Sequence, residues 1–97
     1  MAETMINELF RLAMRAINET DDYVAFEIGN YGYLCRISIM EGGFKDGGEF
    51  EGWYGLVSGN DSLAEKMRQK EFSKAKAHLE RLIAKKRKVA VLTQSES

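Results

Sequence analysis

The sequence predicts an α+β fold, in which a helix and a three-stranded antiparallel sheet are followed by one kinked or two C-terminal helices. The chain has 97 residues, which suits one domain. All nine glycines lie between positions 29 and 59, and glycine favours turns over helix interiors. Apolar residues recur with helical spacing on both sides of this glycine-rich middle. We assign 1–93 to the domain and 94–97 to a disordered tail.

The first helix is expected over 4–19, with Thr4 as its N-cap. Its apolar residues recur three or four positions apart, so they share one side of the helix. We expect that side to be buried, with the stripe formed by Ile6, Leu9, Phe10, Ala13 and Ile17.

Alternating apolar and polar residues predict strands at 23–29 and 32–41, joined by the turn Gly29-Asn30-Tyr31-Gly32. A glycine-rich loop over 41–48 precedes a third strand at 49–58. Gly52 and Gly55 within that strand indicate a bulge or a close backbone approach. Helices at both ends of the chain can cover one face of the sheet. The other face is expected to stay partly open, with Tyr23, Glu27, Leu34, Arg36, Met40 and Trp53 on it.

The C-terminal third begins with a capping box, Ser62-Leu63-Ala64-Glu65, which predicts a helix start. The apolar pattern then changes phase between Met67 and Phe72. One straight helix over 62–88 would be ~40 Å long, so we expect a kink or break near 69–72, with Ser73 capping a last helix. The apolar run at 89–92 predicts a short edge strand.

Charge divides the chain into two parts. Residues 1–60 hold 10 acidic and 4 basic side chains, a net of −6, and residues 61–97 hold 5 acidic and 10 basic ones, a net of +5. Such asymmetry indicates charged partners, or two parts that neutralise each other within the fold.

The composition excludes several function classes. One cysteine, Cys35, cannot form an intrachain disulfide, and together with one histidine, His78, it cannot complete a four-ligand zinc site. We expect no metal and no cofactor. Cys35 is expected to be buried and His78 to be a surface or boundary residue among basic residues, so no nucleophile meets a base and we expect no enzyme.

No run of 18 apolar residues is present, which argues against a membrane-spanning helix and a membrane partner. The first residues lack the basic start and apolar stretch of a signal peptide. We therefore expect a cytoplasmic protein.

The acidic, aromatic middle of the chain favours a non-enzymatic protein-binding module. Exposed aromatic rings beside charges are typical anchors of protein interfaces. An acidic surface suits a protein partner with a basic surface. The predicted contacts are Tyr23, Arg36, Phe44, Glu49, Glu51 and Trp53.

The alternative is a domain that binds double-stranded RNA or DNA. Residues 66–88 hold ten basic and two acidic side chains, and basic helices can contact phosphates. The predicted contacts in this case are Lys70, Lys74, Lys76, Lys85, Lys86 and Lys88. A homodimer would form if the run at 89–92 or a free sheet edge paired two chains.

The opening helix with Met5-Ile6-Asn7-Glu8-Leu9, the strand start Tyr23-Val24 and the acidic hairpins resemble small orphan proteins of phages and prophages. Type II anti-CRISPR inhibitors are among them. The resemblance covers most of the chain as topology. It implies an inhibitor or regulator that occupies a surface on a host protein. The element order is also similar to a double-stranded-RNA-binding domain, whose basic last helix the run Ser73-Lys74-Ala75-Lys76-Ala77 resembles.

Overall fold

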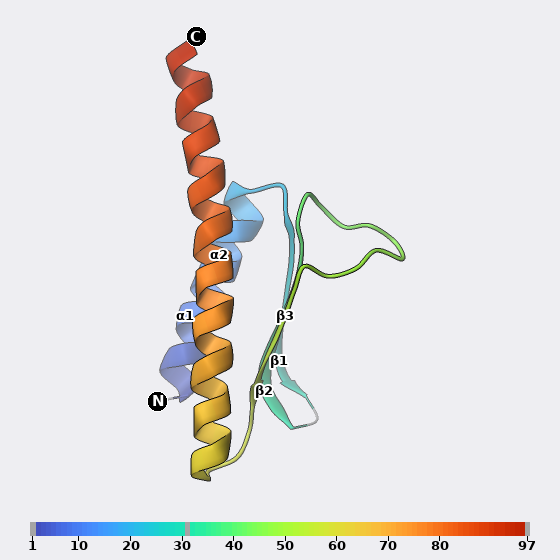
Figure 1. The fold of residues 1–97 in the computed structure, drawn as a ribbon, viewed down its shortest axis with the longest axis vertical. Coiled ribbons are helices and arrows are strands. Elements are labelled where there is room, and N and C mark those ends of the chain that lie inside the picture. The colour runs from blue at the N-terminus through green and yellow to red at the C-terminus, as the bar shows by residue number, and fades with distance from the viewer. Residues whose placement is uncertain (1, 31, 97) are drawn as a thin grey trace.

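The computed structural model describes residues 2–30 and 32–96, with side chains described for 3–29 and 32–85. The elements are α1 (Ala2–Glu19), β1 (Tyr23–Asn30), β2 (Tyr33–Met40), β3 (Gly52–Val57) and α2 (Ser62–Glu96), shown in Figure 1. This αβββα order confirms the predicted α+β class.

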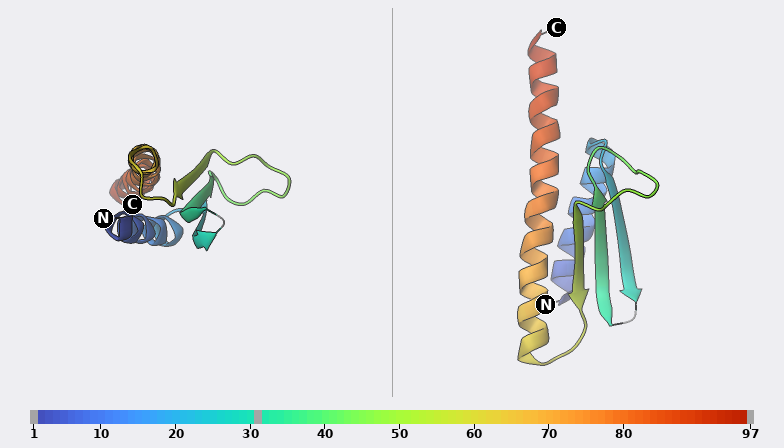
Figure 2. Two further views of the ribbon diagram at one scale, coloured as in Figure 1. Left: turned by 90° about the horizontal axis from the view of Figure 1, so that it is seen from below. Right: turned by 45° about the vertical axis from the view of Figure 1, so that its right-hand side comes forward.

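The three strands form one antiparallel sheet in the order β1-β2-β3. The two helices lie side by side against one face of it, and the loop over 41–51 projects on the opposite side (Figure 2). The core lies between these two layers. Its buried residues come from all elements, and the largest fully buried ones are Leu9, Ile37, Ile39, Leu56, Leu79 and Cys35.

Helix α1 begins at Ala2, two residues before the predicted N-cap Thr4. Leu9, Ala13 and Ala16 form its buried line, because α1 faces α2 and the sheet along this side. The prediction that Phe10 and Ile17 join the buried stripe is wrong. Phe10 is 47% exposed and Ile17 45% exposed. The small side chains of Ala13 and Ala16 permit close packing along a line that leaves both larger residues at its margin.

The hairpin of β1 and β2 pairs Tyr23 with Met40 and Asn30 with Tyr33. Gly29 and Gly32 at its turn have φ of 62° and 86°, a region that glycine adopts readily. The register between β2 and β3 shifts between Tyr33 and Cys35. A Cβ on Gly55 would lie 2.5 Å from the Tyr33 ring, so the close approach predicted at Gly55 is confirmed.

Helix α2 is one continuous helix of 35 residues. The break predicted at 69–72 is therefore wrong, and helix also occupies 89–92, where the sequence predicts a strand. The length argument fails because α2 need not fit within the body of the fold: its C-terminal part projects beyond α1 and the sheet (Figure 1), and the molecule measures 54 Å along its longest axis.

The N-cap of α2 is Asp61, whose Oδ1 accepts a hydrogen bond from the Ala64 N–H at 2.8 Å. Its first turns carry Leu63 and Met67 at the surface, and only later turns pack on the core through residues such as Ala75 and Leu79. This change of environment explains the change of apolar phase without a break. For 86–96 the helical backbone alone is described, so the predicted tail over 94–97 stays an expectation.

Candidate functional site

We call the sheet surface that the helices leave uncovered the open face. Alternation along each strand separates it from the core side, where Ile37 and Leu56 are buried. Cross-strand pairs on the open face are Glu27 with Arg36 and Ser38 with Trp53. Met40 was predicted to lie on this partly open face, but its side chain is not exposed there. Met40 is only 4% exposed, and its Sδ accepts a hydrogen bond from the Lys45 N–H at 3.4 Å, because the following loop folds over it.

Two pairs of aromatic rings flank the open face. Trp53 is 46% exposed and meets the Tyr33 ring edge-on, with 5.7 Å between centroids. Phe44 is 62% exposed and meets the Tyr23 ring in the same manner at 5.1 Å. Such edge-to-face pairs restrain large apolar rings at the surface. Tyr23, Phe44 and Trp53 were all predicted as contacts, and the structure leaves their rings accessible or half-accessible.

Arg36 lies in the middle strand, opposite Glu27 on one side and Gly55 on the other. Its guanidinium donates a hydrogen bond to Glu27 Oε2 at 2.9 Å. Its Nε is buried and has no hydrogen-bond partner among the described residues. A buried donor without an acceptor is unfavourable, and such groups are few in native structures.

The loop over 41–51 is anchored where it leaves and re-enters the sheet. The Glu51 carboxylate accepts a hydrogen bond from the Glu41 N–H at 2.7 Å, and Asp22 accepts one from the Gly42 N–H at 2.7 Å. Glu51, predicted as a partner contact, therefore closes the base of the loop. Glu49 is exposed beside it.

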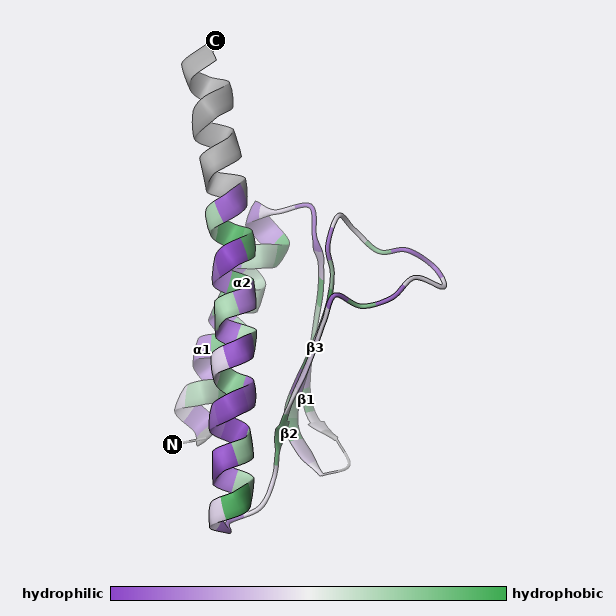
Figure 3. Ribbon diagram, in the orientation of Figure 1, coloured by the Kyte–Doolittle hydropathy of each residue, from purple (hydrophilic) through white to green (hydrophobic). Residues whose placement is uncertain are grey.

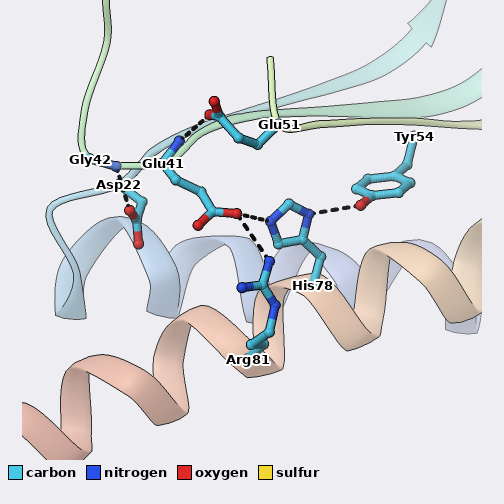
Figure 4. A network of polar contacts seen from close by, with 7 residues as sticks. All are labelled: Asp22, Glu41, Gly42, Glu51, Tyr54, His78 and Arg81. Atoms are coloured by element: carbon cyan, nitrogen blue, oxygen red, sulfur yellow. Dashed lines mark hydrogen bonds and ion pairs between the residues drawn. The ribbon is translucent and has the colours of Figure 1, made fainter. Parts of the chain in front are cut away.

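His78 is the centre of a polar network that joins this loop to α2 (Figure 4). Its Nε2 lies 2.8 Å from Glu41 Oε2 and its Nδ1 lies 2.7 Å from the Tyr54 hydroxyl. Arg81 donates a hydrogen bond to the same Glu41 oxygen at 3.0 Å. His78 is only 7% exposed, so the prediction of a surface or boundary position is wrong.

Gly52 makes the burial of His78 feasible. A Cβ at this position would lie 2.6 Å from His78 Nδ1 and 2.8 Å from the Tyr54 ring. The predicted close approach at Gly52 is thus confirmed, and the group that approaches is the imidazole. His78 and Glu41 are 37 residues apart in sequence, which is why no local pattern indicated their pairing.

A hydroxyl, an imidazole and a carboxylate in a row also occur in acid–base sites. Here the Tyr54 hydroxyl, the His78 imidazole and the Glu41 carboxylate are hydrogen-bonded in sequence. Hydrogen bonding from His78, and then from Arg81, lowers the Glu41 pKa. Burial raises the Tyr54 pKa above its ordinary value. The network connects the loop, β3 and α2.

A second charged surface runs along α2. Lys66, Lys70, Lys74, Arg81 and Lys85 lie within about 100° of its circumference at 100° per residue, and we call them the basic stripe. Figure 3 shows hydrophilic residues along the side of α2 in view, interspersed with hydrophobic ones. Lys66 and Lys70 are exposed and form no ion pair with any residue whose side chain is described.

The structure separates the predicted phosphate contacts. Lys70, Lys74 and Lys85 belong to the basic stripe, whereas Lys76 lies on another side of α2, 3.3 Å from Glu8 of α1. The side chains of Lys86 and Lys88 lie outside the described residues. The ion pairs of Lys76 with Glu8 and Arg81 with Glu41 show that the acidic and basic parts of the chain partly neutralise each other.

Sequence reasoning missed one apolar surface. Phe10, Met14 and Ile17 of α1 are exposed, and Phe10 meets the Phe26 ring at 5.5 Å. Their spacing is that of a buried stripe. One signal in the sequence could have indicated this exposure. The apolar side of α1 also includes Met5, Leu12 and Ala16, so it is broader than one line of contacts can bury.

Within the described part of the chain, no cluster of histidine, cysteine and acidic residues could hold a metal ion, and neither helix is long and apolar enough to cross a membrane. Comparison of the chain with protein-family models, curated proteins and solved structures gives no match.

Proposed function

We propose that this chain is a small, non-enzymatic protein-binding module whose contact surface is the open face together with Phe44. The observation that carries the proposal is the exposure of Trp53 and Phe44 beside a sheet face that neither helix covers. Aromatic side chains held in place by neighbours lose little conformational entropy on binding and are common interface anchors.

Charge indicates the chemistry of the partner. The surface around the rings carries the acidic residues Glu27 and Glu49, both exposed, so it suits a protein with a basic surface. Arg36 provides a donor in the middle of the face, where a carbonyl or carboxylate of the partner would be its acceptor. By occupying such a surface the module would act as an inhibitor or regulator, as its resemblance to phage and prophage proteins implies.

Partner capture from a lysate of the native host tests the proposal with single-residue variants. We expect Trp53→Ala and Phe44→Ala to reduce capture at least ~10-fold, which is typical of interface anchors. Leu63→Ala is the matched control, because Leu63 is an exposed apolar residue on α2, away from the open face. Retention of wild-type capture by both aromatic variants would contradict the proposal.

Nucleic-acid binding is the second candidate, favoured by the alignment of five cations in the basic stripe. Titration with double-stranded RNA and DNA at two salt concentrations tests it, because phosphate contacts give steeply salt-dependent affinity. Lys70→Gln is expected to weaken binding, whereas Lys76→Gln, on the other side of α2, serves as the control. Absence of binding at low salt would exclude this candidate.

A further inference from the structure

The outer side of α1 and the outer edge of β1 together form one margin of the molecule, which we call the β1 margin. α1 packs against β1 and α2 packs against β3, so this margin lies at the opposite edge of the sheet from β3 (Figure 2). β1 has β2 on one side and no strand on the other among the described residues. The β1 margin is separate from the open face and from Phe44.

The helical part of the β1 margin is apolar. Phe10, Met14 and Ile17 lie within about 60° of the circumference of α1 at 100° per residue, and all three side chains are exposed. Phe10 meets the ring of Phe26, so this side of α1 borders β1 and not α2. The three residues therefore form a row along the outer strand.

Ile28 of β1 extends this row. It pairs with Cys35 of β2, which is buried in the core, so Ile28 points to the helix side of the sheet and not to the open face. Ile28 is nevertheless 68% exposed, and Phe26, two residues earlier on the same side, is only half-buried. α1 thus leaves part of the helix side of β1 uncovered.

The outer edge of β1 carries none of the features that commonly keep an edge strand from pairing, such as proline, lysine or a β-bulge. The strand reads YVAFEIGN, and its register with β2 has no shift over 23–28. Its one charged residue, Glu27, is held by Arg36 at 2.9 Å. No described residue of β1 makes a backbone hydrogen bond outside the sheet. Because alternate residues of an outer strand direct their N–H and C=O groups away from the sheet, this edge can pair with another strand.

We propose that the β1 margin binds a second copy of this chain, so that two copies form a symmetric dimer. The two β1 strands pair antiparallel and give one sheet of six strands, three from each copy. The two α1 helices lie side by side on the same face of that sheet. A twofold axis perpendicular to the sheet produces both contacts at once. The margin needs a strand for its edge and an apolar surface for its row, and a second copy supplies both.

The order of the apolar residues along the margin suits this symmetry. Only the three residues 20–22 join α1 to β1, so β1 runs back along α1. The row therefore follows the order Ile17, Met14, Phe10, Ile28. Antiparallel copies place Ile28 of one copy near Ile17 of the other. Phe10 and Met14 meet in the same way near the middle of the row.

The two α1 helices have room beside each other. Paired strands lie about 4.8 Å apart, whereas the axes of packed helices need about 8–10 Å. The axis of α1 must therefore lie a few ångström inward from β1. The exposure of Ile28 agrees with this position, because a helix directly above the edge strand would cover that side chain.

The size of the margin also suits a dimer. α1 has 18 residues and β1 has 8, so each is about 27 Å long at ~1.5 Å and ~3.4 Å per residue. Two layers of about 10 Å each give a contact of about 540 Å² per copy, or about 1,100 Å² in all. Specific interfaces begin near ~1,000 Å². We therefore expect a dissociation constant of about 1–100 µM.

Analytical ultracentrifugation of the whole chain from about 1 µM to about 1 mM tests the proposal. The monomer has a mass of 11.0 kDa, and the measured mass should rise toward twice this value with concentration. Met14→Lys and Ile28→Lys should each raise the dissociation constant at least ~10-fold, because each places a charge from both copies in an apolar contact. Both positions are exposed, so both variants should keep the wild-type circular dichroism spectrum.

Met67→Lys is the matched control for Met14→Lys. Met67 is a similarly exposed methionine, but it lies on α2, away from the β1 margin. This variant should dimerise as the wild type does. Trp53→Ala should also leave dimerisation unchanged, which separates this proposal from that for the open face.

Hydrogen exchange distinguishes strand pairing from contact between the helices alone. In the monomer one alternate set of β1 amides is bonded to β2 and the other set faces water. The exchange of the second set should slow at least about fivefold when the protein concentration is raised to about 1 mM. The amides of β3 should exchange at the same rate throughout.

Three results would overturn the proposal: a monomeric mass at the highest concentration, a dimer that Met14→Lys and Ile28→Lys leave intact, or a dimer in which the β1 amides exchange as fast as in the monomer. A chain that stays monomeric but captures a different protein through Met14 would assign the margin to that partner instead. Loss of partner capture in Phe44→Ala by a monomeric chain would leave the open-face proposal standing alone.

Discussion

At the scale of single residues, Gly52 decides whether His78 can be buried. The imidazole occupies the space that any side chain at position 52 would need. This contact also places His78 between Tyr54 and Glu41, so three distant parts of the sequence meet at one ring. Glycine is required at position 52 because of a histidine on another element, and not because the backbone turns there.

We predict that Gly52→Ala lowers the free energy of unfolding by about 1–3 kcal/mol, the usual cost of overpacking. Urea unfolding measures it. In a His78→Ala background the same change should cost clearly less, since the clash with the imidazole is gone and only the contact with Tyr54 remains. Additive effects of the two substitutions would refute this explanation.

Glu41 should make the stability of the fold depend on pH in the acidic range. Its pKa is lowered in the folded protein, by the hydrogen bond from His78 and then by Arg81. A carboxylate with a lowered folded-state pKa stabilises the fold above its unfolded-state pKa, and this contribution disappears as pH falls through the folded-state value. We therefore predict a fall in stability below about pH 5.

Unfolding curves across this pH range measure the effect. Glu41→Gln should show a shallower decline than the wild type, because the amide does not titrate. Glu49→Gln, at an exposed position in the same loop, should follow the wild-type curve. An unchanged slope in Glu41→Gln would show that the network does not contribute to acid stability.

Cys35 should be chemically inert in the folded protein. Burial raises its thiol pKa to about 11, and the side chain is within the core on β2. The thiolate, which is the reactive form, is then scarce at pH 8. We predict slow labelling by a thiol reagent in buffer and fast, complete labelling in denaturant. Fast labelling under native conditions would mean that β2 opens locally.

At the scale of elements, α2 shows how a helix start depends on one residue. The capping box predicts a cap at Ser62, whereas the hydrogen bond from the Ala64 N–H goes to Asp61. We predict that Asp61→Ala costs about 1 kcal/mol of stability. Ser62→Ala is the matched control and should change it by less than about 0.5 kcal/mol. A larger loss of stability in Ser62→Ala than in Asp61→Ala, measured by urea unfolding, would place the cap at Ser62.

The two helices also show why periodicity identifies an element better than it identifies its buried side. α1 has two neighbours, α2 and the sheet, so its buried line passes through Leu9, Ala13 and Ala16. The spacing of Phe10 fits a buried helical stripe equally well, yet Phe10 lies at the margin of the buried line, against Phe26. Which of two overlapping stripes is buried depends on where the neighbouring elements lie.

At the scale of the whole molecule, the fold has only two layers, the sheet and the pair of helices, so one face of the sheet is left uncovered. Both helices cover the same face of the sheet (Figure 2), and the molecule measures only 16 Å along its shortest axis. The opposite face is therefore available for binding. The proposed protein-binding surface lies on this opposite face.

The sequence by itself determined the α+β class, the element order and the exposure of Trp53 and Phe44. Glycine distribution and local periodicity carry this information because they reflect backbone preferences over a few neighbouring residues. Only the tertiary structure decided the burial of His78, the line of contact on α1 and the unbroken α2. The first two depend on groups far apart in sequence, such as Glu41 with His78, whose meeting is a property of packing and is encoded in no short segment.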